Sequence, residues 1–100
     1  MRSFRTLDLA IKLYQESSSL KMPGHLKNQL LRSTSSIALN LSEARGKRTL
    51  ADQKRFFHIA LGSLRESMTC LILAGYESSS VYRLADVTGA HLYKLIKNAK

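Results

Sequence analysis

Residues 23–75 read PGHLKNQLLRSTSSIALNLSEARGKRTLADQKRFFHIALGSLRESMTCLILAG and contain two long stretches of helical periodicity joined by a short basic turn. Side chains that share one face of the first stretch are mostly apolar: Leu26, Leu30, Ser33, Ile37 and Leu41. The second stretch has an equivalent face: Phe57, Ala60, Leu64, Leu71 and Ala74. Recurrence at intervals of three and four residues is typical of an amphipathic helix. The pattern predicts helices over 23–44 and 49–75.

The sequence on both sides of this segment continues the helical pattern. Upstream, apolar residues at helical spacing predict a helix over 6–19: Leu7, Ala10, Ile11 and Tyr14. Downstream, a similar set predicts a helix over 79–98: Val81, Leu84, Ala85, Leu92 and Ile96. Short breaks rich in Gly, Pro and Ser separate the four segments, and Thr49 with Asp52 can form a capping box at one of them. Because short connections make consecutive helices antiparallel neighbours, the expected fold is all-α. It is an up-down-up-down antiparallel four-helix bundle, with residues 1–100 as its single domain.

Size and composition narrow the class of protein. A chain of 100 residues can bury one core. Lys and Arg number 16 against 7 Asp and Glu, so the formal charge is +9, which indicates a polyanionic partner or a strongly cationic surface. The single cysteine excludes a disulfide framework, and the longest purely apolar run, residues 70–74, is far shorter than a membrane span. We expect a cytoplasmic protein with no membrane association.

Catalytic and metal-binding patterns are missing from the sequence. A di-metal site in a helical bundle uses Glu-x-x-His, yet the positions three residues before the histidines hold Met22, Arg55 and Thr88. Cys70 stands in an apolar run, which favours a buried, inert thiol. No glycine-rich phosphate loop occurs. We therefore expect no enzyme activity, catalytic residue, metal or cofactor.

A polar stripe interrupts the second predicted helix. Arg32, Ser36, Asn40 and Glu43 follow at steps of four, four and three residues, so they share one face. Ser63 and Glu66 are small or polar positions on the third helix. One interpretation is a structural polar network between the two helices or across protomers, in which Arg32 pairs with Glu66. The other is a solvated face whose hydroxyls bond back to their own helix.

A basic cluster surrounds the predicted second turn. It consists of five residues within an eleven-residue span: Arg45, Lys47, Arg48, Lys54 and Arg55. Such a cluster is a candidate surface for the phosphate backbone of nucleic acid, although it can also serve only to keep a loop soluble. Phe56 and Phe57 are adjacent, so at most one of them faces solvent, and the pattern favours non-specific binding over base stacking.

The middle third of the chain resembles a known family. The relevant runs are RSTSSI at 32–37, NLSEARGK at 40–47 and FFHIALGSLRE at 56–66. They are similar to Arg-Ala-x-x-Ser-Ile, Asn-Ile-Ala-Glu-Gly-x-Gly-Arg and Phe-x-x-x-Ala-x-Gly-Ser-x-x-Glu in small bacterial four-helix proteins from intervening sequences of large-subunit ribosomal RNA genes. That family is related to the accessory variability determinant of diversity-generating retroelements. Here Ala44 replaces a glycine and Lys47 an arginine, and the last quarter of the chain matches only as a helix.

The resemblance implies a four-helix bundle that assembles as a homopentamer and has no enzyme activity. For the retroelement branch it implies a basic partner of a reverse transcriptase and its nucleic acid. Self-association also fits six leucines that lie off the main apolar stripes: Leu9, Leu20, Leu31, Leu39, Leu61 and Leu73. Two functions remain open at this point. The protein is either an oligomeric accessory factor that binds nucleic acid, or an oligomeric protein-interaction scaffold whose charge serves only solubility.

Overall fold

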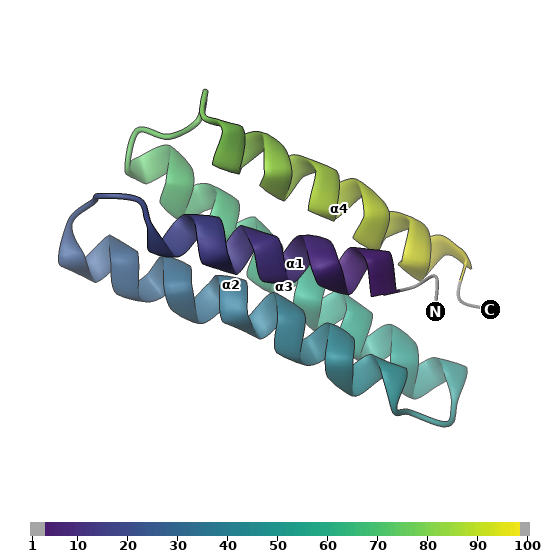
Figure 1. Ribbon diagram of the computed structural model, residues 1–100. Coiled ribbons are helices and arrows are strands. Elements are labelled where there is room, and N and C mark those ends of the chain that lie inside the picture. The colour runs from purple at the N-terminus through teal and green to yellow at the C-terminus, as the bar shows by residue number, and fades with distance from the viewer. Residues whose placement is uncertain (1–3, 99–100) are drawn as a thin grey trace.

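The computed structural model describes residues 4–98 and arranges them as four helices (Figure 1). These are α1 (Phe4–Ser18), α2 (Gly24–Arg45), α3 (Leu50–Leu73) and α4 (Ser80–Asn98). Each helix begins and ends within about two residues of its predicted position, and α3 runs unbroken through Gly62. Residues 4–98 contain no strand. The prediction of an all-α four-helix bundle is confirmed.

Consecutive helices run antiparallel, and each helix packs against two others (Figure 1). Helix α1 contacts α2 and α4, whereas α3 contacts α2 and α4 on the opposite side, and the α2–α3 pair has the most extensive contact. The bundle is elongated, with extents of 40 × 21 × 18 Å. The start of α1, the α2–α3 turn and the end of α4 therefore lie at one end of the molecule, which we call the turn end.

Local sequence explains where the two central helices begin and end. Thr49 caps α3, because its hydroxyl accepts a hydrogen bond from the Asp52 amide at 3.1 Å. Pro23 precedes α2, and its carbonyl accepts from the amides of Leu26 and Lys27. After α3, Gly75 adopts φ of +87°, and the Tyr76 amide bonds back to the Leu71 carbonyl at 2.8 Å. This left-handed cap favours glycine and turns the chain towards α4.

The core consists mainly of side chains from the predicted apolar faces of α2, α3 and α4. In α1 the prediction was partly wrong, because Ile11 and Tyr14 are exposed while Leu13 is buried beside Ala10. Core side chains with no exposed surface include Leu13, Leu30, Ile37, Leu71 and Leu92.

Helix α3 is long and apolar enough to cross a membrane by length and composition alone, a test that the core helix of a bundle also passes. The bundle core explains part of this apolar composition, because α3 buries Ala60, Leu64 and Leu71 against its neighbours. Other apolar residues of α3 are exposed: Leu50, Ile59, Ile72 and Leu73.

Gly89 lies at a close contact between α4 and α3. A Cβ atom at this position would lie 2.8 Å from Cδ2 of Leu64, a side chain that is itself buried. We expect Gly89→Ala to lower the free energy of unfolding, since overpacking costs about 1–3 kcal/mol and the better helix propensity of alanine returns at most about 1 kcal/mol. In a Leu64→Val background, which lacks the δ carbons, the same change should become neutral or stabilising. Urea unfolding of the four proteins measures this coupling, and additive effects would contradict the close contact.

Candidate functional site

Hydroxyl groups form the polar contact between α2 and α3. Ser33 Oγ and Ser67 Oγ are buried and lie 2.7 Å apart. About one turn further along α2, Ser36 Oγ lies 2.8 Å from Ser63 Oγ. Asn40 Nδ2 donates to Ser36 Oγ at 3.0 Å and to the Ser36 carbonyl at 2.8 Å. The paired serine hydroxyls satisfy one another's hydrogen-bonding groups between the helices. Because serine side chains are small, they also let the two helices approach closely.

The charged members of the predicted network lie elsewhere. Arg32, Glu43 and Glu66 are exposed, and no Arg32–Glu66 ion pair is present within residues 4–98. Glu43 instead pairs with Lys47 one turn along the chain, with Oε1 and Nζ 3.2 Å apart. Burying a charge pair costs desolvation of both ions, whereas serine hydroxyls satisfy each other in the space between the helices. Within a single chain, the structure therefore replaces the expected charged bridge with a hydroxyl seam: Ser33, Ser36, Ser63 and Ser67.

This arrangement changes the expected effect of Glu66→Ala and predicts a larger effect for Ser67→Ala. Had Glu66 held a buried Arg32, Glu66→Ala would cost about 3–5 kcal/mol of stability. Because both side chains are exposed, we expect Glu66→Ala to change the free energy of unfolding of the isolated chain by less than about 0.5 kcal/mol. Ser67→Ala removes the partner of a buried hydroxyl and should cost about 1 kcal/mol. Denaturant unfolding compares the two, and a larger loss for Glu66→Ala in a monomeric protein would contradict the hydroxyl seam.

The basic cluster lies around the turn between α2 and α3. Arg45 ends α2, whereas Lys54 and Arg55 occupy the first turns of α3, and all three are exposed. Lys47 is half-buried, with its Nζ 5.0 Å from the centre of the Phe56 ring, and the Arg55 guanidinium lies 4.5 Å from the same ring. Two cations thus lie against Phe56, which leaves this ring poorly placed to stack on a base.

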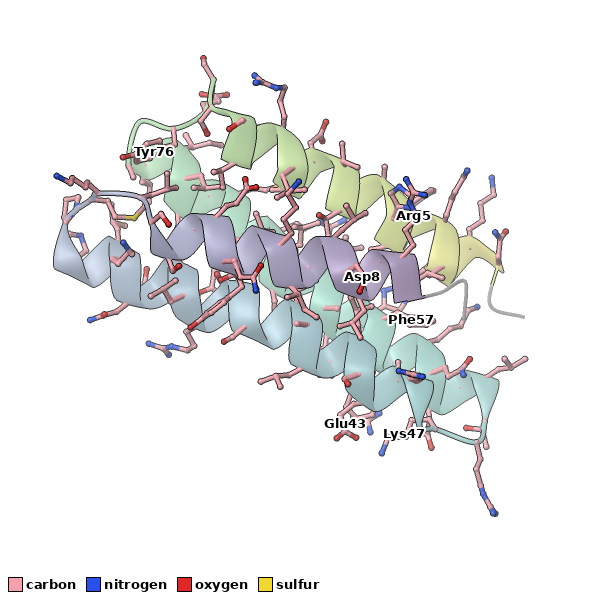
Figure 2. The ribbon with its side chains drawn as sticks, viewed as in Figure 1. Arg5, Asp8, Glu43, Lys47, Phe57 and Tyr76 are labelled. Atoms are coloured by element: carbon pink, nitrogen blue, oxygen red, sulfur yellow. The ribbon has the colours of Figure 1, made fainter. Side chains whose placement is uncertain are left out.

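Basic residues that are distant in the sequence lie at the same end of the bundle as the cluster. Arg5 lies in the first turn of α1, and Lys94 and Lys97 lie in the last turns of α4; all three are exposed. Figure 2 shows Arg5 at the same end as Glu43 and Lys47, with Tyr76 at the opposite end. We divide each described helix at its midpoint and count each connecting segment with the half that it joins. The turn end then has eight basic and three acidic residues, and the other half has six basic and four acidic residues. These three residues could not be assigned to the site from the sequence, because only the antiparallel packing places them at the same end as the turn.

The histidines and the cysteine do not gather into a reactive site within residues 4–98. No group of three His, Cys, Asp or Glu side chains there is placed to hold a metal ion. Cys70 is buried, and burial, followed by the charge of the Glu66 carboxylate, raises the pKa of its thiol above the ordinary 9.0. A raised pKa keeps the thiol protonated at neutral pH, which disfavours its use as a nucleophile. The feature of the described residues that stands out for function is the charge at the turn end.

Comparison with known proteins identifies one family. A family model described as "23S rRNA-intervening sequence protein" matches residues 3–79. The match covers α1, α2 and α3 with the basic turn, and it ends just before α4. No curated protein is similar enough to the chain to count as a match.

Proposed function

This chain belongs to the 23S rRNA-intervening sequence protein family, and from that premise we propose that it is a non-enzymatic, oligomeric accessory protein that binds nucleic acid through phosphate contacts. The observation that carries the proposal is the concentration of positive charge at the turn end. Lys and Arg side chains that neutralise phosphates release counterions, and this release supplies most of the free energy of non-specific binding. The basic excess is larger at the turn end than in the other half of the bundle, as such a contact surface needs.

The dimensions of the turn end suit several phosphates at once. The bundle is 21 × 18 Å across. Duplex DNA carries one charge per 1.7 Å of its axis, so a length equal to this width presents about 11 to 12 phosphate charges. Eight basic side chains at the turn end are thus comparable in number to the phosphates within reach. This match favours contacts along the backbone over recognition of individual bases.

We also propose that the outer surface of α2 and α3 mediates self-association. Ile59, Glu66 and Leu73 recur at intervals of seven residues on α3, and Arg32 and Leu39 do so on α2. Leu39 and Leu73 are 66% and 67% exposed, and Ile59 is 41% exposed. An exposed apolar seam at heptad spacing is typical of a surface that packs against another helix. We name it the heptad surface: Arg32, Leu39, Ile59, Glu66 and Leu73.

The leucines that motivated the prediction of self-association differ in their burial. Leu39 and Leu73 are exposed, whereas the other four are half-buried in the bundle: Leu9, Leu20, Leu31 and Leu61. The half-buried leucines are explained in part by their own chain, since Leu20 and Leu61 pack against the core. The exposed pair therefore supports self-association more strongly than the full set of six. The homopentamer and the reverse transcriptase partner, both implied by the resemblance, stay predictions.

The test of the proposed function is a binding titration with labelled duplex and single-stranded nucleic acid between low and physiological salt. We expect tight binding at low salt, little dependence on sequence and a steep loss of affinity as salt rises. No detectable binding of either probe at low salt would contradict the proposal. That result would favour the alternative, an oligomeric scaffold whose charge only aids solubility.

A further inference from the structure

Among the aromatic side chains of residues 5–98, that of Tyr93 is the most exposed, and it lies at the turn end. It is 61% exposed, compared with 38% for Tyr14 on α1. Phe57 is buried, and Phe56 is half-buried against Lys47 and Arg55. Because aromatic side chains stack on bases in sites that bind single strands, an exposed ring within a proposed nucleic-acid surface is a candidate stacking position.

The residues around Tyr93 on α4 are small or basic. Lys97 follows by four positions, so it lies on the same face of the helix. Ala90 and Lys94 occupy the adjoining strip and, with His91, line a shallow open depression of about 110 Å³. The side chain of Ala90 is too small to cover the Tyr93 ring. Tyr93 therefore presents an open aromatic surface beside two flexible cations.

Charge distinguishes this patch from an apolar protein interface. Lys94 and Lys97 follow Tyr93 on α4 by one and four positions, and Arg5 lies at the same end on the neighbouring helix α1. The nearest acidic residues along these two helices are Asp8, one turn beyond Arg5, and Asp86, about two turns before Tyr93. An aromatic ring among cations suits a ligand that has both flat bases and phosphates. Single-stranded nucleic acid offers both, whereas the bases of a duplex are stacked on one another.

We propose that Tyr93 is a stacking platform for an unpaired base of single-stranded nucleic acid, whose neighbouring phosphates contact Lys94 and Lys97. The proposal rests on the proposed function and narrows it, because it gives the turn end a preference for strands with unpaired bases. It also assigns a role to α4, which lies beyond the part of the chain that matches the family model. Stacking tolerates any base, so the preference is for strandedness and not for sequence.

The experiment measures the fluorescence anisotropy of a labelled oligothymidylate and of a labelled hairpin duplex of equal charge with each variant at low salt. Tyr93→Ala should weaken binding of the single strand by about 5- to 150-fold, which corresponds to about 1–3 kcal/mol for one stacked base. Binding of the duplex should change by less than about twofold. Tyr93→Phe keeps the ring and should bind both probes like the wild type. Tyr14→Ala is the matched control, because it removes an exposed tyrosine from the other half of the bundle.

A tryptophan at this position supplies a second, independent readout. The protein contains no tryptophan, so Tyr93→Trp creates a single reporter that can itself stack on a base. We expect oligothymidylate to quench its emission and the hairpin to leave it nearly unchanged; Tyr14→Trp should respond to neither. Equal effects of Tyr93→Ala on both probes, or none on the single strand, would overturn the stacking platform while leaving the proposed function intact. Failure of the wild type to bind either probe would overturn both.

Discussion

Reversing the charge of four residues around the α2–α3 turn is expected to lower the affinity for duplex nucleic acid by about 10³-fold at low salt. The variant replaces Arg45, Arg48, Lys54 and Arg55 with Glu and keeps Lys47, which pairs with Glu43 at 3.2 Å. Each phosphate contact on a duplex contributes about −0.9 to the slope of log affinity against log salt concentration, so four lost contacts reduce its magnitude by up to about 3.6. Titrations at several salt concentrations measure both the affinity and the slope.

The control for this variant has the same net charge but a different distribution. It replaces Lys12, Lys21, Arg65 and Arg83 with Glu, four exposed residues outside the turn end. Lys12 pairs with Glu16 at 3.9 Å, and an exposed pair of this kind contributes little stability. If the turn end holds the phosphates, the control should keep most of its affinity and nearly all of its salt slope, because screening weakens the effect of distant charges. Equal losses in the two variants would show that only total charge matters and would contradict a localised surface. Circular dichroism checks that both remain helical.

Placing a carboxylate on the heptad surface is expected to convert the assembled protein into monomers of 11.2 kDa. Ile59→Glu adds a negative charge to an exposed apolar position one heptad before Glu66. If another protomer covers this surface, the new carboxylate loses its water without gaining a partner, which costs several kcal/mol per contact. Light scattering at micromolar concentration measures the mass. For a pentamer, the assembly implied by the resemblance, the expected change is about fivefold.

The matched control is His58→Glu, an exposed neighbour on α3 that lies outside the heptad surface. It adds the same carboxylate to the same helix, and we expect it to leave the assembled mass unchanged. A wild-type protein that is monomeric at micromolar concentration would contradict self-association. An assembly that tolerates Ile59→Glu as well as His58→Glu would place the interface on another surface of the bundle.

The candidate site could be predicted only in part. The cluster from Arg45 to Arg55 is visible in the sequence because its members are close along the chain. Arg5 and Lys97 lie at opposite ends of the chain, and their common position follows only from the antiparallel packing of α1 and α4. The exposure of Tyr93 could not be predicted from the sequence, for a related reason. Its exposure depends on which strip of α4 faces α1 and α3, and helical periodicity alone does not measure how much of a ring stays in water.

The contacts of the polar network could also be predicted only in part. Ser36 and Ser63 could be identified as small polar positions on two long helices, but their pairing depends on the axial register of α2 against α3. Arg32 and Glu66 follow the same spacing and make no such bridge within the chain, since their charged ends remain in water. A sequence pattern shows which face a side chain occupies, whereas the distance between helices decides whether hydroxyls or charges fit between them.

The number, order and approximate bounds of the helices were determined by the sequence itself. Apolar spacing, the Thr49 cap and breaks such as Gly75 act over a few residues, so they can be interpreted from local sequence. The tertiary structure alone decided that Ser33 meets Ser67, that eight basic residues share one end and that Tyr93 stays exposed beside Lys97. These outcomes depend on the register and antiparallel packing of whole helices, because the groups that meet lie far apart along the chain.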